Sequence, residues 1–177
     1  MQQTSSPDSP AQPVFVWSDA WVMASVAVGG GLKGCELKDV VAAGELLNRA
    51  LLSPMELRGA LAKLLARGYV DRTGSHYVIA GEARYAVEQI LRQHAPSFNV
   101  MQFFEEFLDV DAYAANDADA WAPGRGSGDI TEMQAEAAIA AHRAQVAGIW
   151  RELRRVDDDS LPERAVRVFG EAARAHS

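Results

Sequence analysis

One short segment, Ser-Pro-Met-Glu at residues 53–56, constrains the fold of this chain more than any other local pattern. Serine suits the N-cap of a helix, proline suits the first helical position, and a glutamate three residues after the serine completes a capping box. Leu52 and Leu57 flank this box at the spacing of a hydrophobic staple. We therefore predict that a helix begins at Pro54.

The residues after the capping box continue a helical pattern and then change to a strand pattern. Four leucines recur on one side of the helix by the 3.6-residue period: Leu57, Leu61, Leu64 and Leu65. Gly68 is a natural C-terminal stop. Residues 69–72 and 76–79 are short strand-like runs joined by Thr-Gly-Ser at residues 73–75, so we predict a β-hairpin.

Further helices are predicted on both sides of this unit. The first has Ser18 as its N-cap and Asp19 in its first turn, and it ends at three glycines, residues 29–31. The second covers residues 36–51, with apolar residues spaced by three to five, and another covers residues 82–94.

The resulting order is helix, helix, helix, hairpin, helix. The segment LRGALAKLLARGYVDRTGSHYVIAGEAR, residues 57–84, resembles the winged helix-turn-helix superfamily, and the resemblance covers roughly Trp17 to His94. The fold class expected from it is mainly α with a small β-hairpin, a winged helix-turn-helix followed by an α-helical C-terminal extension. The resemblance implies that the third helix enters a DNA major groove and that the hairpin touches the backbone or minor groove.

The charge distribution separates two parts of the chain. The net charge is −7, yet the first hundred residues carry nine basic and nine acidic side chains, so the acidic excess belongs to the later residues. A uniformly basic nucleic-acid surface is excluded. We expect a disordered tail at 1–13, which is rich in Gln, Ser, Thr and Pro, a winged-helix-like domain at 14–96, and an acidic helical extension at 97–177.

The third helix offers few groups for reading double-stranded DNA. Its expected outward positions are Met55, Gly59, Ala62, Lys63 and Ala66, with Arg58 flanking. Base recognition uses several adjacent Arg, Lys, Asn or Gln side chains, so the patch is weak. Arg49 and Arg67 extend it, and a solvated face with no DNA role is the alternative. The candidate DNA-binding residues are Arg58, Lys63, Arg72, Thr73 and Ser75.

The small residues on the same helix suit a different role. Gly59, Ala62 and Ala66 favour packing against another protein chain, which predicts an adaptor that uses the scaffold without nucleic acid. A further hypothesis is that acidic residues 105–119 cover the basic patch and inhibit it.

The extension is predicted to be helical. A Phe-rich amphipathic segment follows residue 100, and a long alanine-rich helix covers 130–155. The long helix has an apolar seam that pairs either with a second copy of the chain or with a helix of the same chain. The residues of this candidate interaction face are Ile139, His142, Val146, Ile149 and Leu153. A second capping box, Ser160 to Glu163, opens a final helix.

Catalytic and metal-binding patterns are lacking in the sequence. The four histidines show no metal-ligand spacing, and His142 is expected to be a hydrogen-bonded interfacial histidine. No GxSxG or phosphate-loop pattern occurs, and the acidic run from Asp109 does not match a calcium loop. We therefore expect no enzyme activity, no metal and no cofactor.

The cellular setting is inferred from cysteine usage and from the N-terminus. Cys35 is the single cysteine, and residues 1–13 lack the apolar core of a signal peptide. We expect a cytoplasmic protein with no membrane segment. The function predicted is a winged-helix regulatory protein with weak or partner-assisted DNA binding and an oligomerising extension, and the partners considered are DNA, a second copy in a homodimer, or another protein.

Overall fold

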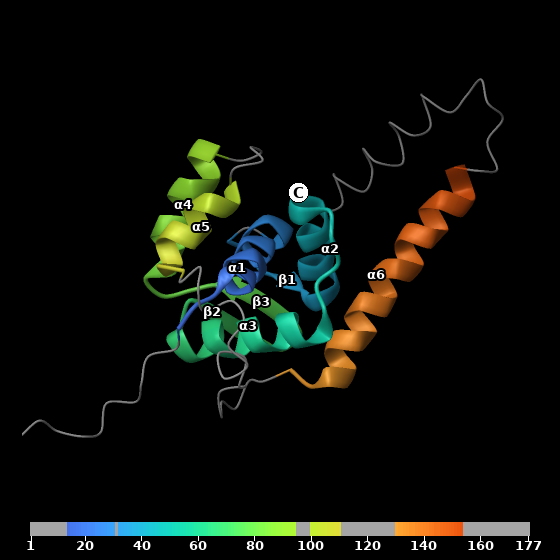
Figure 1. The fold of residues 1–177 in the computed structure, drawn as a ribbon, viewed down its shortest axis with the longest axis horizontal. Helices are drawn as coiled ribbons and strands as arrows, with labels where there is room; N and C mark the ends of the chain where they lie inside the picture. The colour runs from blue at the N-terminus through green and yellow to red at the C-terminus, as the bar shows by residue number, and fades with distance from the viewer. Residues whose placement is uncertain (1–13, 31, 95–99, 111–129, 154–177) are drawn as a thin grey trace, which may run out of the picture.

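The structure is a computed structural model that describes residues 14–30, 32–94, 100–110 and 130–153. These residues form a mainly helical fold with a small three-stranded antiparallel sheet (Figure 1). In chain order the elements are α1 (Trp17–Gly30), β1 (Cys35–Glu36), α2 (Leu37–Asn48), α3 (Pro54–Arg67), β2 (Val70–Thr73), β3 (His76–Ile79), α4 (Ala83–His94), α5 (Val100–Leu108) and α6 (Glu132–Leu153).

Helix α1 lies at the centre of the fold. Every residue from 18 to 27 is buried, because this segment is apolar or small except at Asp19 and neighbouring elements cover it. The helix packs against α2, α3 and α5, with the sheet at one end (Figure 1). Ser18 is not the predicted N-cap; it lies inside the helix, and the Asp19 carboxylate instead accepts a hydrogen bond from the Val16 N–H at 2.7 Å.

The start and end of α3 follow the sequence prediction. Ser53 Oγ accepts a hydrogen bond from the Glu56 N–H at 3.2 Å, and Glu56 Oε2 accepts one from the Ser53 N–H at 2.8 Å. Pro54 is the first helical residue, and Gly68 ends the helix with a φ of 74°. This confirms the capping box and fixes the direction in which α3 leaves the preceding loop.

The predicted hairpin is present and is joined by one more strand. Strands β2 and β3 pair in antiparallel fashion, with Val70 opposite Ile79 and Thr73 opposite His76. β1 pairs with β3 on the side opposite to β2, where Cys35 lies opposite Tyr77. The strand order is therefore β1-β3-β2, with β3 in the centre. The sequence interpretation placed Glu36 in a helix, whereas it belongs to β1 and forms the N-cap of α2.

Two helix boundaries differ from those predicted. The first helix continues through Gly29 and Gly30, where these residues allow a close approach: a Cβ on Gly30 would lie 2.7 Å from the Cys35 nitrogen. The second helix stops at Asn48 rather than residue 51, because Arg49 adopts a left-handed conformation with a φ of 54°.

The described part of the extension shares the core of the first half. Val100, Phe104 and Leu108 of α5 are buried in the same hydrophobic cluster as α1. Ile130 and the buried positions of α6 belong to this cluster as well. Residues 14–94 and the described residues beyond 100 therefore pack around one core. The final helix predicted from residue 161 lies outside the described residues.

Candidate functional site

Lys63, a predicted DNA-binding residue on α3, points into the molecule. Its side chain is only 6% exposed and forms an ion pair with Asp19, whose side chain is fully buried on α1. The Lys63 ammonium also donates to the Val14 carbonyl oxygen at 3.4 Å. The expectation that Lys63 faces outward is therefore wrong, because a buried carboxylate on the central helix holds it inside.

Burial governs the electrostatics of this pair. Removal from water raises the pKa of Asp19, while the hydrogen bond from Lys63 and the one from the Val16 N–H act in the opposite direction. One carboxylate oxygen, Asp19 Oδ1, is buried with no hydrogen-bond partner, as is Ser18 Oγ. The pair joins α1 to α3 over 44 positions of sequence.

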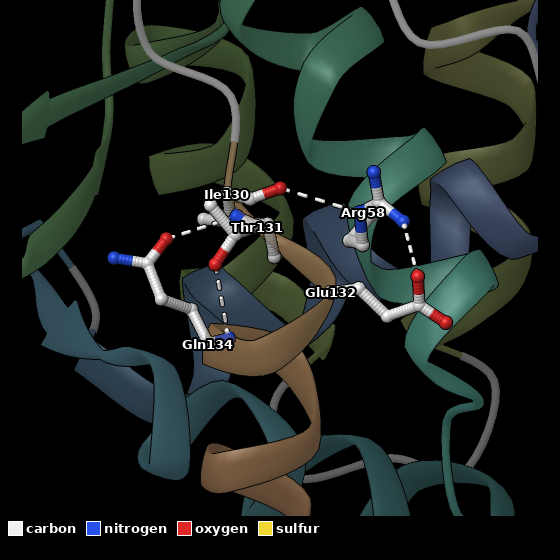
Figure 2. Close-up of polar contacts among 5 residues, drawn as sticks. All are labelled: Arg58, Ile130, Thr131, Glu132 and Gln134. Atoms are coloured by element: carbon white, nitrogen blue, oxygen red, sulfur yellow. Dashed lines mark hydrogen bonds and ion pairs between the residues drawn. The ribbon is translucent and has the colours of Figure 1, made fainter.

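Arg58, the other residue of α3 that was predicted to contact DNA, binds the beginning of α6. Its Nε donates to the Ile130 carbonyl oxygen at 3.2 Å, and its guanidinium lies 3.6 Å from Glu132 Oε2 (Figure 2). The side chain is 32% exposed. Thr131 and Gln134 form a capping box at the same point, since each side chain accepts a hydrogen bond from the other residue's N–H.

Helix α6 packs along α2 and α3 through the seam that the sequence predicted. Ile139 and His142 are buried, and His142 Nε2 forms a hydrogen bond with the Glu45 carboxylate on α2. Val146 and Ile149 are half-buried farther along. Of the two alternatives for this seam, the pairing within the chain is the one observed. His142 is an interfacial hydrogen-bonded histidine as expected, and the side chain of Leu153 lies outside the described part.

The small-residue face proposed for an adaptor is largely covered. Gly59 and Ala62 are buried, and only Ala66 of the three is exposed. The outward positions predicted for α3 are thus reduced to Met55, which is 65% exposed, and Ala66. The face does not offer a continuous surface to another chain.

The hairpin residues lie where the sequence predicted them, at the surface. Thr73, Ser75 and His76 are exposed, and Arg72 is half-buried. Arg72 Nε donates to the Gly74 carbonyl oxygen at 3.0 Å, and its guanidinium lies over the Tyr77 ring, 5.5 Å from the ring centre. The structure does not bring these residues together with Lys63, so the five predicted DNA-binding residues form no single patch.

A groove between α2 and the C-terminal half of α6 was not predicted. It has a volume of about 370 Å³ and is lined by Ala42, Glu45, Leu46, Val146, Ile149 and Trp150. Leu46 is 72% exposed and Trp150 is 54% exposed, although large apolar side chains are usually buried. Leu46 is one of the regularly spaced apolar residues that predicted the second helix, and it lies on the exposed side of that helix.

Searches of the described residues for a metal-binding cluster and for a membrane-spanning helix found neither. No three His, Cys, Asp or Glu side chains gather there in a way that would hold a metal ion. Within the same ranges, none of the helices combines the length and apolar character that a bilayer crossing requires. Comparisons with protein-family models, with curated proteins and with solved structures found no match.

Proposed function

We propose that this chain is a protein-interaction module built on a winged-helix scaffold. The scaffold assignment is supported by the order α1-β1-α2-α3-β2-β3, by the capped third helix and by a hairpin that follows it directly. The proposal does not include recognition of DNA bases by α3. Both residues of α3 that were predicted to bind DNA make contacts within the chain: Lys63 pairs with Asp19, and Arg58 binds the start of α6.

The observation that carries the proposal is the apolar groove between α2 and α6. Four of its six lining side chains are large and apolar, and Leu46 projects at its edge with 72% of its surface exposed. Exposed apolar surface of this kind marks interaction sites. A groove bounded by two helices suits an amphipathic helix whose apolar side chains recur at positions i, i+3 or i+4, and i+7.

Selection from a displayed library of amphipathic helical peptides tests this function. We expect enrichment of peptides with that spacing, and we expect Leu46→Asp to weaken their binding at least about tenfold, or about 1.4 kcal/mol. Tyr85→Asp is the matched control, because Tyr85 is 73% exposed on α4 and does not line the groove. Equal loss or equal retention of binding in the two variants would refute the assignment.

A second candidate function is contact with DNA phosphates through the β2–β3 hairpin. It is favoured by the exposure of Thr73, Ser75 and His76 at the tip, beside the Arg72 guanidinium. Such contacts supply affinity without sequence specificity, and their strength falls with salt.

Fluorescence anisotropy with a random-sequence duplex tests the second candidate. If the hairpin binds, Arg72→Ala should reduce the slope of log affinity against log salt by about 1, whereas Arg84→Ala, at an exposed position on α4, should not. Absence of saturable binding up to roughly 100 μM at low salt would eliminate this candidate, since non-specific binders reach that range even at physiological salt.

A further inference from the structure

The α2–α6 groove opens beside the end of the described part of α6. Its lining residues on that helix, Val146, Ile149 and Trp150, occupy the last turns before Leu153. The chain then continues from residue 154 to residue 177. The described part of α6 therefore ends within one turn of the groove-lining residue Trp150.

The sequence of this continuation has the pattern of a helix that fits such a groove. Ser160 and Glu163 form the second predicted capping box. From residue 161 onward, apolar residues fall on one side of a helix with a 3.6-residue period: Leu161, Ala165, the adjacent Val168 and Phe169, and Ala172. Arg164, Arg167 and Arg174 fall outside the stripe, so one side is suited to apolar contact and the other to water.

The length of the connection permits a return to the groove. Residues 154–160 reach up to about 23 Å when extended. Axes of packed helices lie only about 8–10 Å apart, so this connection is long enough to reverse the chain direction. A helix over residues 161–173 would be about 20 Å long, comparable with the part of α6 that borders α2 beyond Ile139.

We propose that residues 161–173 of the same chain dock as an amphipathic helix in the groove between α2 and α6. The apolar stripe from Leu161 to Ala172 faces Leu46, Val146 and Ile149, and the arginines face solvent. The inference deepens the proposed function, because it makes the chain's own terminal segment the resident occupant that an external helix must displace.

Disulfide trapping in the full-length chain tests this docking. Native Cys35 is first replaced by Ser, and Leu46→Cys is then combined with one cysteine at a time at 165, 168, 169 or 172. Matched controls place the second cysteine at 164, 167, 171 or 174, outside the stripe. Disulfides require Cα atoms within about 7 Å, so a docked segment holds the stripe positions in range and turns the control positions away.

We expect at least one stripe position to form an intramolecular disulfide about tenfold faster than the controls, because the tether gives both sets of thiols a similar effective concentration and only docking favours the stripe. Four separate stripe variants keep the test decisive if one of them fails to fold. Covalent dimers in place of cyclised monomers would assign the groove to a second copy and overturn the proposal. Equal rates at stripe and control positions would also overturn it, and neither result would affect the peptide-selection test of the proposed function.

Discussion

Lys63 of α3 and Asp19 of α1 form an ion pair in the interior, with side chains 6% and 0% exposed. In a winged helix that reads DNA, α3 is the helix that supplies base-contacting side chains. Here its lysine joins α3 to the central helix, and its Arg58 binds the first residues of α6. The Lys63 and Arg58 side chains are therefore both engaged in contacts within the chain.

Asp19→Asn should be strongly destabilising, because the Lys63 charge then stays buried without its counter-ion. We expect the free energy of unfolding to fall by about 3–5 kcal/mol, measured by urea unfolding followed by circular dichroism. The double replacement Asp19→Asn with Lys63→Met should recover most of that loss, since it removes both charges from the interior and keeps a side-chain oxygen for the Val16 N–H. A double variant as unstable as the single one would show that the pair is not the source of the effect.

Arg58→Ala should loosen the attachment of α6 to α3. Loss of the hydrogen bond to the Ile130 carbonyl oxygen and of the contact with Glu132 should cost about 1.5–3 kcal/mol in unfolding free energy, the range for a bond to a charged group. Arg67→Ala is the control, because Arg67 makes a surface ion pair with Glu82 at 3.7 Å that is worth about 1 kcal/mol or less. Similar losses in both variants would contradict the role assigned to Arg58.

Two glycine-to-alanine substitutions in helices should change the stability of the fold in opposite directions. A Cβ on Gly44 of α2 would lie 2.9 Å from Leu52 Cδ1 and 3.1 Å from Ser25 Oγ. Gly44→Ala should therefore destabilise by about 1–3 kcal/mol through overpacking. Gly148 of α6 has nothing within 4 Å of its Cβ position, so Gly148→Ala should stabilise by up to about 1 kcal/mol through helix propensity. Thermal unfolding compares the two variants, and a stabilising effect of Gly44→Ala would contradict the close packing of Leu52 and Ser25 against α2.

The stability of the fold should decrease in alkaline solution because of Cys35. Burial, with a smaller effect from the Asp39 charge, raises the pKa of this thiol from 9.0 to about 12. The folded state thus keeps its proton more tightly than the unfolded chain, and the free energy of unfolding falls as pH rises from about 9 towards 12. Urea unfolding from about pH 8 to about pH 11 should show a steeper decline for the native chain than for Cys35→Ala. Parallel declines would contradict the raised pKa.

Features fixed by near neighbours in sequence were predictable. The capping box of Ser53 and Glu56 places both partners within one helical turn, and Gly68 ends the helix through its own backbone conformation. The hairpin is also local, because two residues join β2 to β3. In each case the determining contact spans only a few residues.

Features fixed by distant partners were missed. β1 exists because Cys35 pairs with Tyr77, and Lys63 turns inward because of Asp19, which is 44 residues away. One signal did point to the second contact: Asp19 is the single charged residue in a helix that is otherwise apolar or small, and a helix buried on all sides must provide such a charge with a partner. No comparable signal in the sequence indicated that Leu46 is exposed. Its spacing from the other apolar residues of α2 is the spacing that a buried leucine would also have.

The central structural claim is that α6 covers α2 and α3 as part of one core. Amide hydrogen exchange of the full chain tests it most directly, by comparing Ile139 and His142 of α6 with Leu57 and Leu61 of α3. Residues that open only by global unfolding share one opening free energy. We expect protection factors for the two helices to agree within about tenfold, or about 1.4 kcal/mol. Rapid exchange throughout α6 beside strong protection in α3 would show that α6 detaches and would contradict the account.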